Sequence, residues 1–147
     1  MRRLPVFVLA FVLGFSSLGC DSGEDDPSDA ELFVGTWALV NITDGGGDKT
    51  PLLLAAANSM VAVLNSNNTF EVDIDYKEQP DLHLEGTYVV DEGAKQLVLT
   101  VGPQNPPFTY SFASDTRTTI SANSQIVNGL FATTLYTGNV VMTIQKQ

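Results

Sequence analysis

Short segments in which apolar and polar residues alternate run through most of the chain, and they restrict its fold more than any other feature. In residues 69–77 the apolar positions of this alternation are Phe70, Val72, Ile74 and Tyr76. A period of two is the pattern of a β-strand that buries one face. The same alternation returns in residues 82–90, 97–101, 108–112 and 139–145.

Four further segments are rich in β-branched or aromatic residues and complete the set of expected strands: 33–43, 60–64, 116–122 and 125–136. In the first of them, period two places Phe33, Gly35, Trp37 and Leu39 on one buried face. Eight or nine strands at a spacing of about ten residues, mostly joined by short turns, predict an all-β antiparallel barrel or sandwich.

One short helix is expected at residues 50–58. Thr50 can cap it, Pro51 suits its first turn, and Asn58 can end it. A helix of about two turns is unstable alone. It must therefore pack on the sheet, either as a plain packing element or as a lid over a cavity.

The N-terminal segment predicts secretion. Arg2 and Arg3 precede an apolar run of residues 4–15, and small residues follow up to Cys20, the only cysteine. This is the composition of a signal peptide, and the run is shorter than the roughly 20 residues that span a bilayer. It resembles a bacterial lipoprotein signal, which implies a signal peptide at residues 1–19 and a Cys20 that carries acyl chains such as palmitate. Alternatively, ordinary cleavage after residues 17–19 would leave Cys20 as a free thiol.

Residues 20–30 hold five acidic residues and no basic one. Such a segment buries too little apolar surface to order itself, so we expect a flexible tether before a domain at residues 31–147. The whole chain carries a formal charge of −10, and loss of Arg2 and Arg3 with the signal makes it more negative. A surface this acidic repels phosphate backbones, which excludes nucleic acid as a partner.

Three short motifs give the chain a family resemblance. They are Gly35-Thr36-Trp37, Gly86-Thr87-Tyr88 and Gln96-Leu97-Val98-Leu99, with Phe70 in a strand between the first two. In this order they resemble the lipocalin-like domains of bacterial surface lipoproteins. The resemblance covers residues 32–146 and implies an up-and-down barrel of about eight strands with Trp37 at its closed end. Lipocalins also pack a late-strand arginine on this tryptophan, whereas Arg117, the only arginine after the signal, is not in the last strand.

A barrel of eight strands either fills with side chains or holds one small ligand. The candidate residues of an apolar calyx are Trp37, Phe70, Val72, Ile74, Tyr76, Tyr88, Phe108, Tyr110 and Phe112. Two hypotheses follow. The first is a lipid-anchored protein of the bacterial cell envelope, at the outer membrane or cell surface, that binds a small hydrophobic ligand. The second is a structural or interaction lipoprotein with a filled core, whose protein partner the sequence does not indicate.

The chain offers little for catalysis. His83 is its only histidine, so neither a Cys/His metal cluster nor a Ser-His-Asp arrangement is expected. The carboxylates of residues 71, 73, 75 and 85 alternate with apolar residues, which favours a solvated outer face over a glycosidase pair. Asp44 and Asp48 flank three glycines, a composition typical of a connecting loop rather than a cation site. The expectation is a protein that is not an enzyme and has no cofactor.

Overall fold

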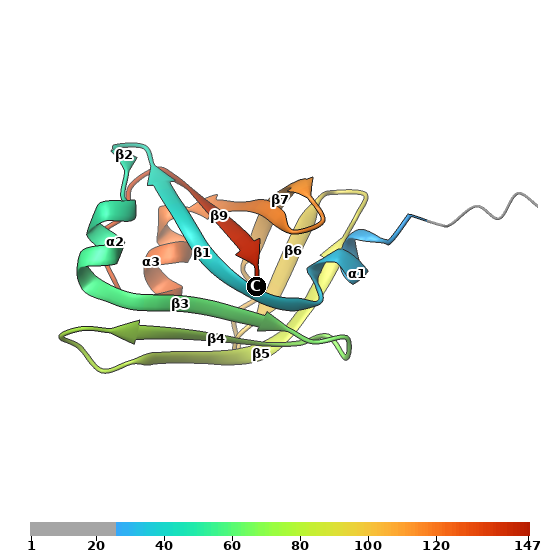
Figure 1. Ribbon diagram of the computed structural model, residues 1–147, viewed down its shortest axis with the longest axis horizontal. Helices are drawn as coiled ribbons and strands as arrows, with labels where there is room; N and C mark the ends of the chain where they lie inside the picture. Colours follow the sequence, from blue (N-terminus) through green and yellow to red (C-terminus); the bar gives the residue numbers. More distant parts are fainter. Residues whose placement is uncertain (1–25) are drawn as a thin grey trace, which may run out of the picture.

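Eight antiparallel strands close into a barrel in the computed structural model, which describes residues 26–147 (Figure 1). Each strand pairs with the next one along the chain, and β1 also pairs with β9, which closes the sheet. The strands are β1 Gly35–Asp44, β3 Ala57–Leu64, β4 Thr69–Tyr76, β5 Leu82–Asp91, β6 Gln96–Thr100, β7 Pro107–Ser114, β8 Arg117–Asn123 and β9 Asn139–Lys146. A short extra strand, β2 Gly47–Asp48, pairs with the end of β1. The predicted all-β, up-and-down barrel is therefore confirmed, and the sandwich alternative is wrong.

Three short helices lie at the two ends of the barrel. Figure 1 shows α2 (Thr50–Ala56) and α3 (Ser124–Leu130) at one end and α1 (Asp29–Phe33) at the other. No helix within residues 26–147 is long and apolar enough to cross a membrane. The predicted signal peptide, Cys20 and most of the predicted tether lie outside the described residues.

The N-terminal helix α1 differs from the sequence prediction, which assigned residues up to Ala30 to a flexible tether and Phe33 to a strand. Ser28 and Glu31 form a capping box: the Ser28 hydroxyl accepts from the Glu31 N–H at 3.3 Å, and the Glu31 carboxylate accepts from the Ser28 N–H at 2.9 Å. This cap satisfies two backbone donors that would otherwise lack intrahelical partners. The helix ends in Phe33, whose side chain is completely buried. The end of the segment predicted as a tether is therefore helical.

The strand predicted for residues 125–136 was wrong. Residues 124–130 form α3, and an irregular loop follows up to β9. The Asn123 side chain caps this helix by accepting from the Ile126 N–H at 3.0 Å. Val127 and Leu130 stand three residues apart, so one helix face buries both. The apolar residues of this segment follow the helical period and not the alternation of a strand.

The predicted helix at residues 50–58 is confirmed as α2, although it ends at Ala56 and its caps differ. Lys49 holds the N-cap position without a side-chain bond. The Thr50 hydroxyl instead accepts from the Ile42 N–H at 3.0 Å. That bond ties α2 to β1, while Asn58 belongs to β3.

Candidate functional site

The end of the barrel at α1 is filled by an aromatic plug, which consists of Phe33, Trp37, Tyr110 and Phe112. The ring centroid of Phe33 lies 4.9 Å from that of Tyr110 and 4.8 Å from that of Phe112. The Trp37 Nε1–H donates to the Phe33 carbonyl oxygen at 2.7 Å, so the buried indole has its partner. Three of the predicted calyx residues thus pack against one another and line no cavity.

Polar residues hold this plug in place. The Lys146 ammonium donates to the Leu32 carbonyl at 3.0 Å and lies 5.3 Å from the Trp37 ring centroid. The last strand therefore does supply a basic residue that packs on the tryptophan, as a lysine. Asp29 pairs with Lys95 and accepts from the Tyr110 hydroxyl at 2.6 Å. These two hydrogen bonds lower the pKa of Asp29, whereas burial and the Asp29 charge raise the pKa of Tyr110.

The middle of the barrel is nearly full. An inner cavity of about 60 Å³ remains, and its lining is entirely apolar. Phe70, Val72 and Phe108 of the predicted calyx line it. Tyr88 lines neither this cavity nor the cleft described next, and its hydroxyl donates to the Asn65 carbonyl at 2.9 Å. A space this small has no room for more than a fragment of a ligand.

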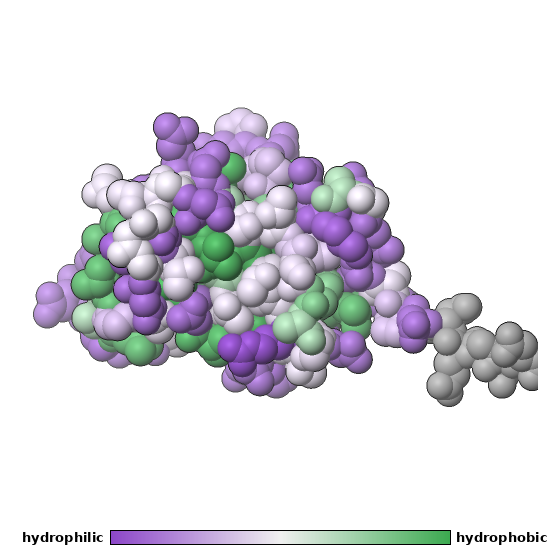
Figure 2. All heavy atoms as spheres, turned by 90° about the horizontal axis from the view of Figure 1, so that it is seen from above, coloured by the Kyte–Doolittle hydropathy of each residue, from purple (hydrophilic) through white to green (hydrophobic). Residues whose placement is uncertain are grey.

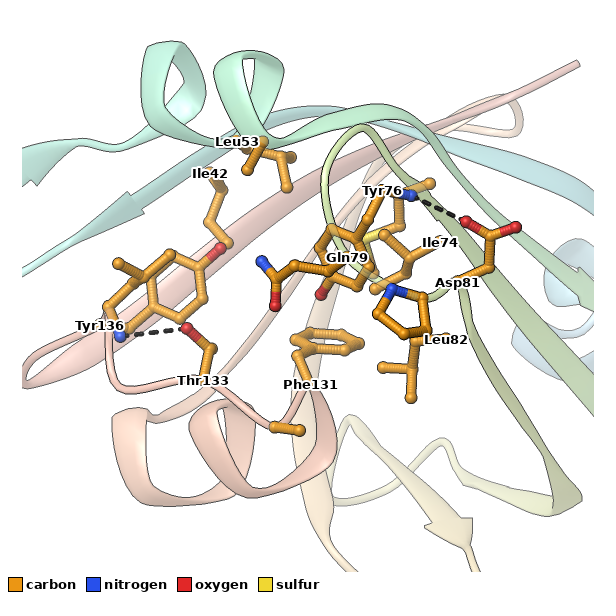
Figure 3. A pocket seen from close by; sticks show the side chains of 15 residues that line it. Ile42, Leu53, Ile74, Tyr76, Gln79, Asp81, Leu82, Phe131, Thr133 and Tyr136 are labelled. Carbon is orange, nitrogen blue, oxygen red and sulfur yellow. Dashed lines mark hydrogen bonds between the residues drawn. The ribbon is translucent and has the colours of Figure 1, made fainter.

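A larger cleft of about 310 Å³ opens at the end where α2 and α3 lie (Figure 3). Its walls come from β1, α2, β3, β4, the β4–β5 turn, the start of β5 and the loop after α3. The lining residues are Ile42, Leu53, Ala56, Met60, Ile74, Tyr76, Gln79, Pro80, Asp81, Leu82, Phe131, Ala132, Thr133, Leu135 and Tyr136. Only Ile74 and Tyr76 were among the nine predicted calyx residues. Met60 and Phe131 line both spaces, so the cleft lies directly above the inner cavity.

Apolar side chains also surround the cleft entrance. Leu52 and Leu54 on α2 and Leu135 in the loop after α3 are each more than half exposed. In Figure 2 apolar residues are visible at the end of the molecule away from the N-terminal chain, and others lie in the middle of the face and toward the N-terminal chain. The entrance thus offers apolar contact to a molecule that approaches this end.

Two loops that form the cleft are fixed by side chains that bond to backbone groups. In the β4–β5 turn, the Asp81 carboxylate accepts from the Tyr76 N–H at 3.1 Å (Figure 3). After α3, the Asn128 side chain donates to the Tyr136 carbonyl at 2.9 Å and accepts from the Tyr136 N–H at 3.1 Å. Backbone groups paired in this way cannot shift without losing hydrogen bonds. The shape of the cleft is therefore preformed.

Asp44 fixes the loop after α3 to the end of β1. Its buried carboxylate accepts from the Thr137 N–H at 2.8 Å and the Gly46 N–H at 2.7 Å, and Lys49 lies 3.7 Å away. Burial acts to raise the pKa of Asp44, but these hydrogen bonds and the Lys49 charge outweigh it and lower the pKa. Asp44 was predicted to lie in a connecting loop. It also joins that loop to the loop after α3, which is far away in the sequence.

One polar group of the cleft forms no hydrogen bond within the described residues and is open to the cleft space. Tyr136 is only 7 % exposed, and its hydroxyl forms no hydrogen bond with any residue of the described range 26–147. Figure 3 shows the Tyr136 hydroxyl and the Gln79 amide directed into the space between the labelled side chains. Burial raises the pKa of Tyr136, and Tyr76 and Asp44 raise it further, so the phenol stays protonated.

Ile42 shows why the alternation failed to identify part of this site. The predicted buried face of the first strand continued through Trp37 and Leu39. A β-bulge between Leu39 and Asn41 shifts the register, and Ile42 becomes the buried residue that lines the cleft. A bulge adds one residue to one strand and so reverses its inward positions. Period two alone carries no signal of it.

The acidic residues of β4 and β5 lie on the outer face, as the alternation predicted. Asp73 and His83 are both more than half exposed, and the His83 Nδ1 lies 2.7 Å from the Asp73 carboxylate. This hydrogen bond raises the pKa of His83. Within residues 26–147, no group of three or more His, Cys, Asp or Glu side chains is arranged to hold a metal ion.

Comparisons with known proteins add no relationship to this geometry. No protein-family model matches the chain, and no curated protein matches it. The function must therefore be argued from the barrel and its cleft.

Proposed function

We propose that this protein binds a small hydrophobic ligand in the cleft of a lipocalin-like barrel and is anchored through Cys20 to a membrane of the bacterial cell envelope. The cleft of about 310 Å³ carries the binding part of this proposal. That volume is at the lower end of the range of small-molecule sites, and such sites combine a mainly apolar lining with a few polar groups. The cleft has this composition: Ile42, Leu53 and Phe131 with Tyr136 and Gln79.

The position of the cleft supports the combination of binding and anchoring. The cleft lies at the α2–α3 end, whereas the described chain enters the barrel through α1 at the opposite end (Figure 1). An anchor that precedes α1 joins the barrel at the end away from the cleft. Ligand entry and attachment to a membrane therefore do not compete for one surface.

Blocking the cleft tests the binding function. We expect Ala56→Trp to abolish the fluorescence increase of 1,6-diphenylhexatriene, an apolar dye, that wild-type protein produces. Ala56 ends α2 and lines the cleft, so an indole there occupies the space that the dye needs. Ala55→Trp is the matched control, because Ala55 is exposed on the same helix and does not line the cleft. Titration of the full chain and both variants gives the three affinities.

A specific result would support the second function instead. If wild-type protein produces no increase in dye fluorescence, or if both tryptophan variants bind the dye equally, the cleft is not the binding site. The barrel would then be a structural or interaction protein with a filled core. Its small inner cavity and its exposed leucines at the cleft entrance fit that alternative.

The anchor is tested by Cys20→Ala in the full precursor, expressed in a bacterial host. We expect wild-type protein to incorporate labelled palmitate and to fractionate with membranes, and the variant to become soluble. Each buried CH₂ of an acyl chain contributes about 0.8 kcal/mol to membrane binding, so two or three chains anchor the wild-type protein firmly. The variant carries no acyl chain and therefore has no anchor. Ser22→Ala, two residues further on, serves as the control. An unlabelled wild-type protein would instead indicate ordinary signal cleavage and a free thiol.

A further inference from the structure

We infer that the ligand of this cleft carries an uncharged oxygen, as in an alcohol, ketone or ester, which pairs with the Tyr136 hydroxyl in a mainly apolar site. This inference rests on the proposed binding function and adds the chemical class of the ligand. It excludes fatty-acid anions as the preferred ligands. Three observations carry it: a hydroxyl that faces the cleft without a partner among the described residues, the hydrogen bonds that hold its residue in place, and the charges around the cleft.

The first observation is the Tyr136 hydroxyl itself. Tyr136 is 93 % buried, and its hydroxyl reaches no acceptor or donor within residues 26–147. Every fully buried side-chain polar atom of the described residues has a partner, so this hydroxyl is reached by solvent through the cleft and is free to bond to a molecule that displaces that solvent. The hydroxyl points into the cleft (Figure 3). A ligand oxygen is the partner that this geometry leaves room for.

The second observation is how firmly Tyr136 is held. Asn128 bonds both backbone polar groups of Tyr136, and Asp44 bonds the backbone N–H of the next residue, Thr137. These bonds place the phenol before a ligand arrives. A preorganised group loses little conformational freedom on binding, so more of its hydrogen-bond energy contributes to affinity.

The third observation is the charge of the surroundings. Among the described residues that line the cleft there is no lysine, arginine or histidine, and the one charged side chain is Asp81. Two lysines next to the elements that form the cleft are engaged elsewhere: Lys49 faces Asp44, and Lys77 donates to the Leu54 carbonyl. A ligand carboxylate would therefore enter an apolar site beside Asp81 and Asp44 without a counter-ion. Burying an unpaired charge is far more costly than burying a hydrogen-bonded neutral group.

A cationic ligand is also disfavoured. The Asp81 carboxylate already accepts from the Tyr76 N–H, and Asp44 is enclosed by Thr137, Gly46 and Lys49. Asp44 does not line the cleft, and Asp81 is exposed to solvent at its edge, so neither provides a buried counter-ion for an ammonium group. The other polar lining residues, Tyr76, Gln79 and Thr133, are uncharged. The cleft is thus matched to a neutral head and an apolar body.

The test compares three ligands that share one chain: 1-decanol, decanoate and decylamine. Each is titrated at neutral pH against full-length protein loaded with 1,6-diphenylhexatriene, an apolar dye that needs no hydrogen bond. We expect 1-decanol to displace the dye at a concentration at least about tenfold lower than the two charged ligands, because only they bring an unpaired charge. Tyr136→Phe should weaken 1-decanol about three- to tenfold, each affinity being corrected for the dye affinity measured for the same variant.

Tyr88→Phe is the matched control, because it removes a buried tyrosine hydroxyl whose partner is the Asn65 carbonyl, away from the cleft. It should leave 1-decanol affinity unchanged, and circular dichroism checks that both variants fold. Equal displacement by decanoate, tighter binding of decylamine, or unchanged 1-decanol affinity in Tyr136→Phe would overturn the inference alone. Absence of dye binding by wild-type protein would overturn the proposed function as well.

Discussion

Replacement of Phe33 by alanine is expected to lower the free energy of unfolding by about 3–5 kcal/mol, the range for a phenylalanine removed from a packed core. The Phe33 ring is completely buried between Tyr110 and Phe112 and also lines the inner cavity of about 60 Å³, which its truncation would enlarge. Its backbone carbonyl also accepts from the Trp37 Nε1–H. The truncation therefore removes the centre of the aromatic plug and weakens the packing around the Trp37 indole.

Urea unfolding, followed by tryptophan fluorescence, measures this change, because Trp37 is the only tryptophan. Leu52→Ala is the control: Leu52 is 52 % exposed at the cleft entrance, so its loss should cost no more than about 0.5 kcal/mol. Below its unfolding transition, Phe33→Ala should still bind the apolar dye, since the cleft lies at the opposite end of the barrel. A loss below about 1 kcal/mol would show that α1 is not part of the core.

The barrel could be predicted because its strands repeat one physical pattern. Phe70, Val72 and Ile74 alternate with acidic residues, and all three are buried in the structure while the acids face water. A closed sheet with one wet face imposes this period on nearly every strand. The helix after the glycine-rich loop follows from equally local signals, whereas the position of Trp37 at the filled end was implied by the family resemblance. The strands and this helix need no knowledge of distant contacts.

The two errors in secondary structure have a common cause. At Ser28 and Asn123, a single side chain caps a helix within a segment whose composition suggests something else. The acidic residues before Phe33 favoured a tether, and the β-branched residues after Ser124 favoured a strand. A cap contributes about 1 kcal/mol, which decides the outcome for a helix as short as α1 or α3. Composition averages over a window and misses such single contacts.

The cleft was only partly predictable for a different reason. Ile74 and Tyr76 continue a strand pattern, whereas Gln79, Phe131 and Tyr136 lie on loops. Their positions depend on bonds such as those of Asn128 and Asp44, which join residues far apart in the sequence. Alternation places a residue inside the barrel but cannot place it along the barrel axis. It therefore grouped the aromatic plug with the cleft walls, although they lie at opposite ends.

The tightest point of the sheet is at Gly86, where β5 passes between β4 and β6. A β-carbon built on Gly86 would lie 1.9 Å from the Thr100 carbonyl oxygen and 3.1 Å from the Phe70 ring. The first of these contacts is with backbone, so no side-chain rotation relieves it. Gly86 stands opposite Phe70 in the β4–β5 register, and its neighbour Thr87 pairs with Thr100. No side chain larger than the hydrogen atom of glycine fits at position 86.

We therefore expect Gly86→Ala to lower the free energy of unfolding by about 3 kcal/mol or more, at the upper end of the cost of overpacking a core. The added methyl group must push β5 away from β6 or displace the Phe70 ring. Thermal unfolding followed by circular dichroism measures the loss. Leu82, at the start of the same strand, lines the cleft. If the methyl group displaces β5, the loss of stability should therefore be accompanied by weaker dye binding.

Gly129→Ala is the matched control for this substitution. Gly129 lies within α3, and a β-carbon there would meet no atom within 4 Å. Alanine should therefore stabilise the protein by about 0.5–1 kcal/mol through its higher helix propensity. Both substitutions replace glycine by alanine. If Gly86→Ala lowers the free energy of unfolding and Gly129→Ala raises it, the effect of close strand packing is separated from that of backbone freedom. If Gly86→Ala were as stable as wild type, the close approach of Thr100 to Gly86 would be wrong, and with it the path of β5 around the barrel.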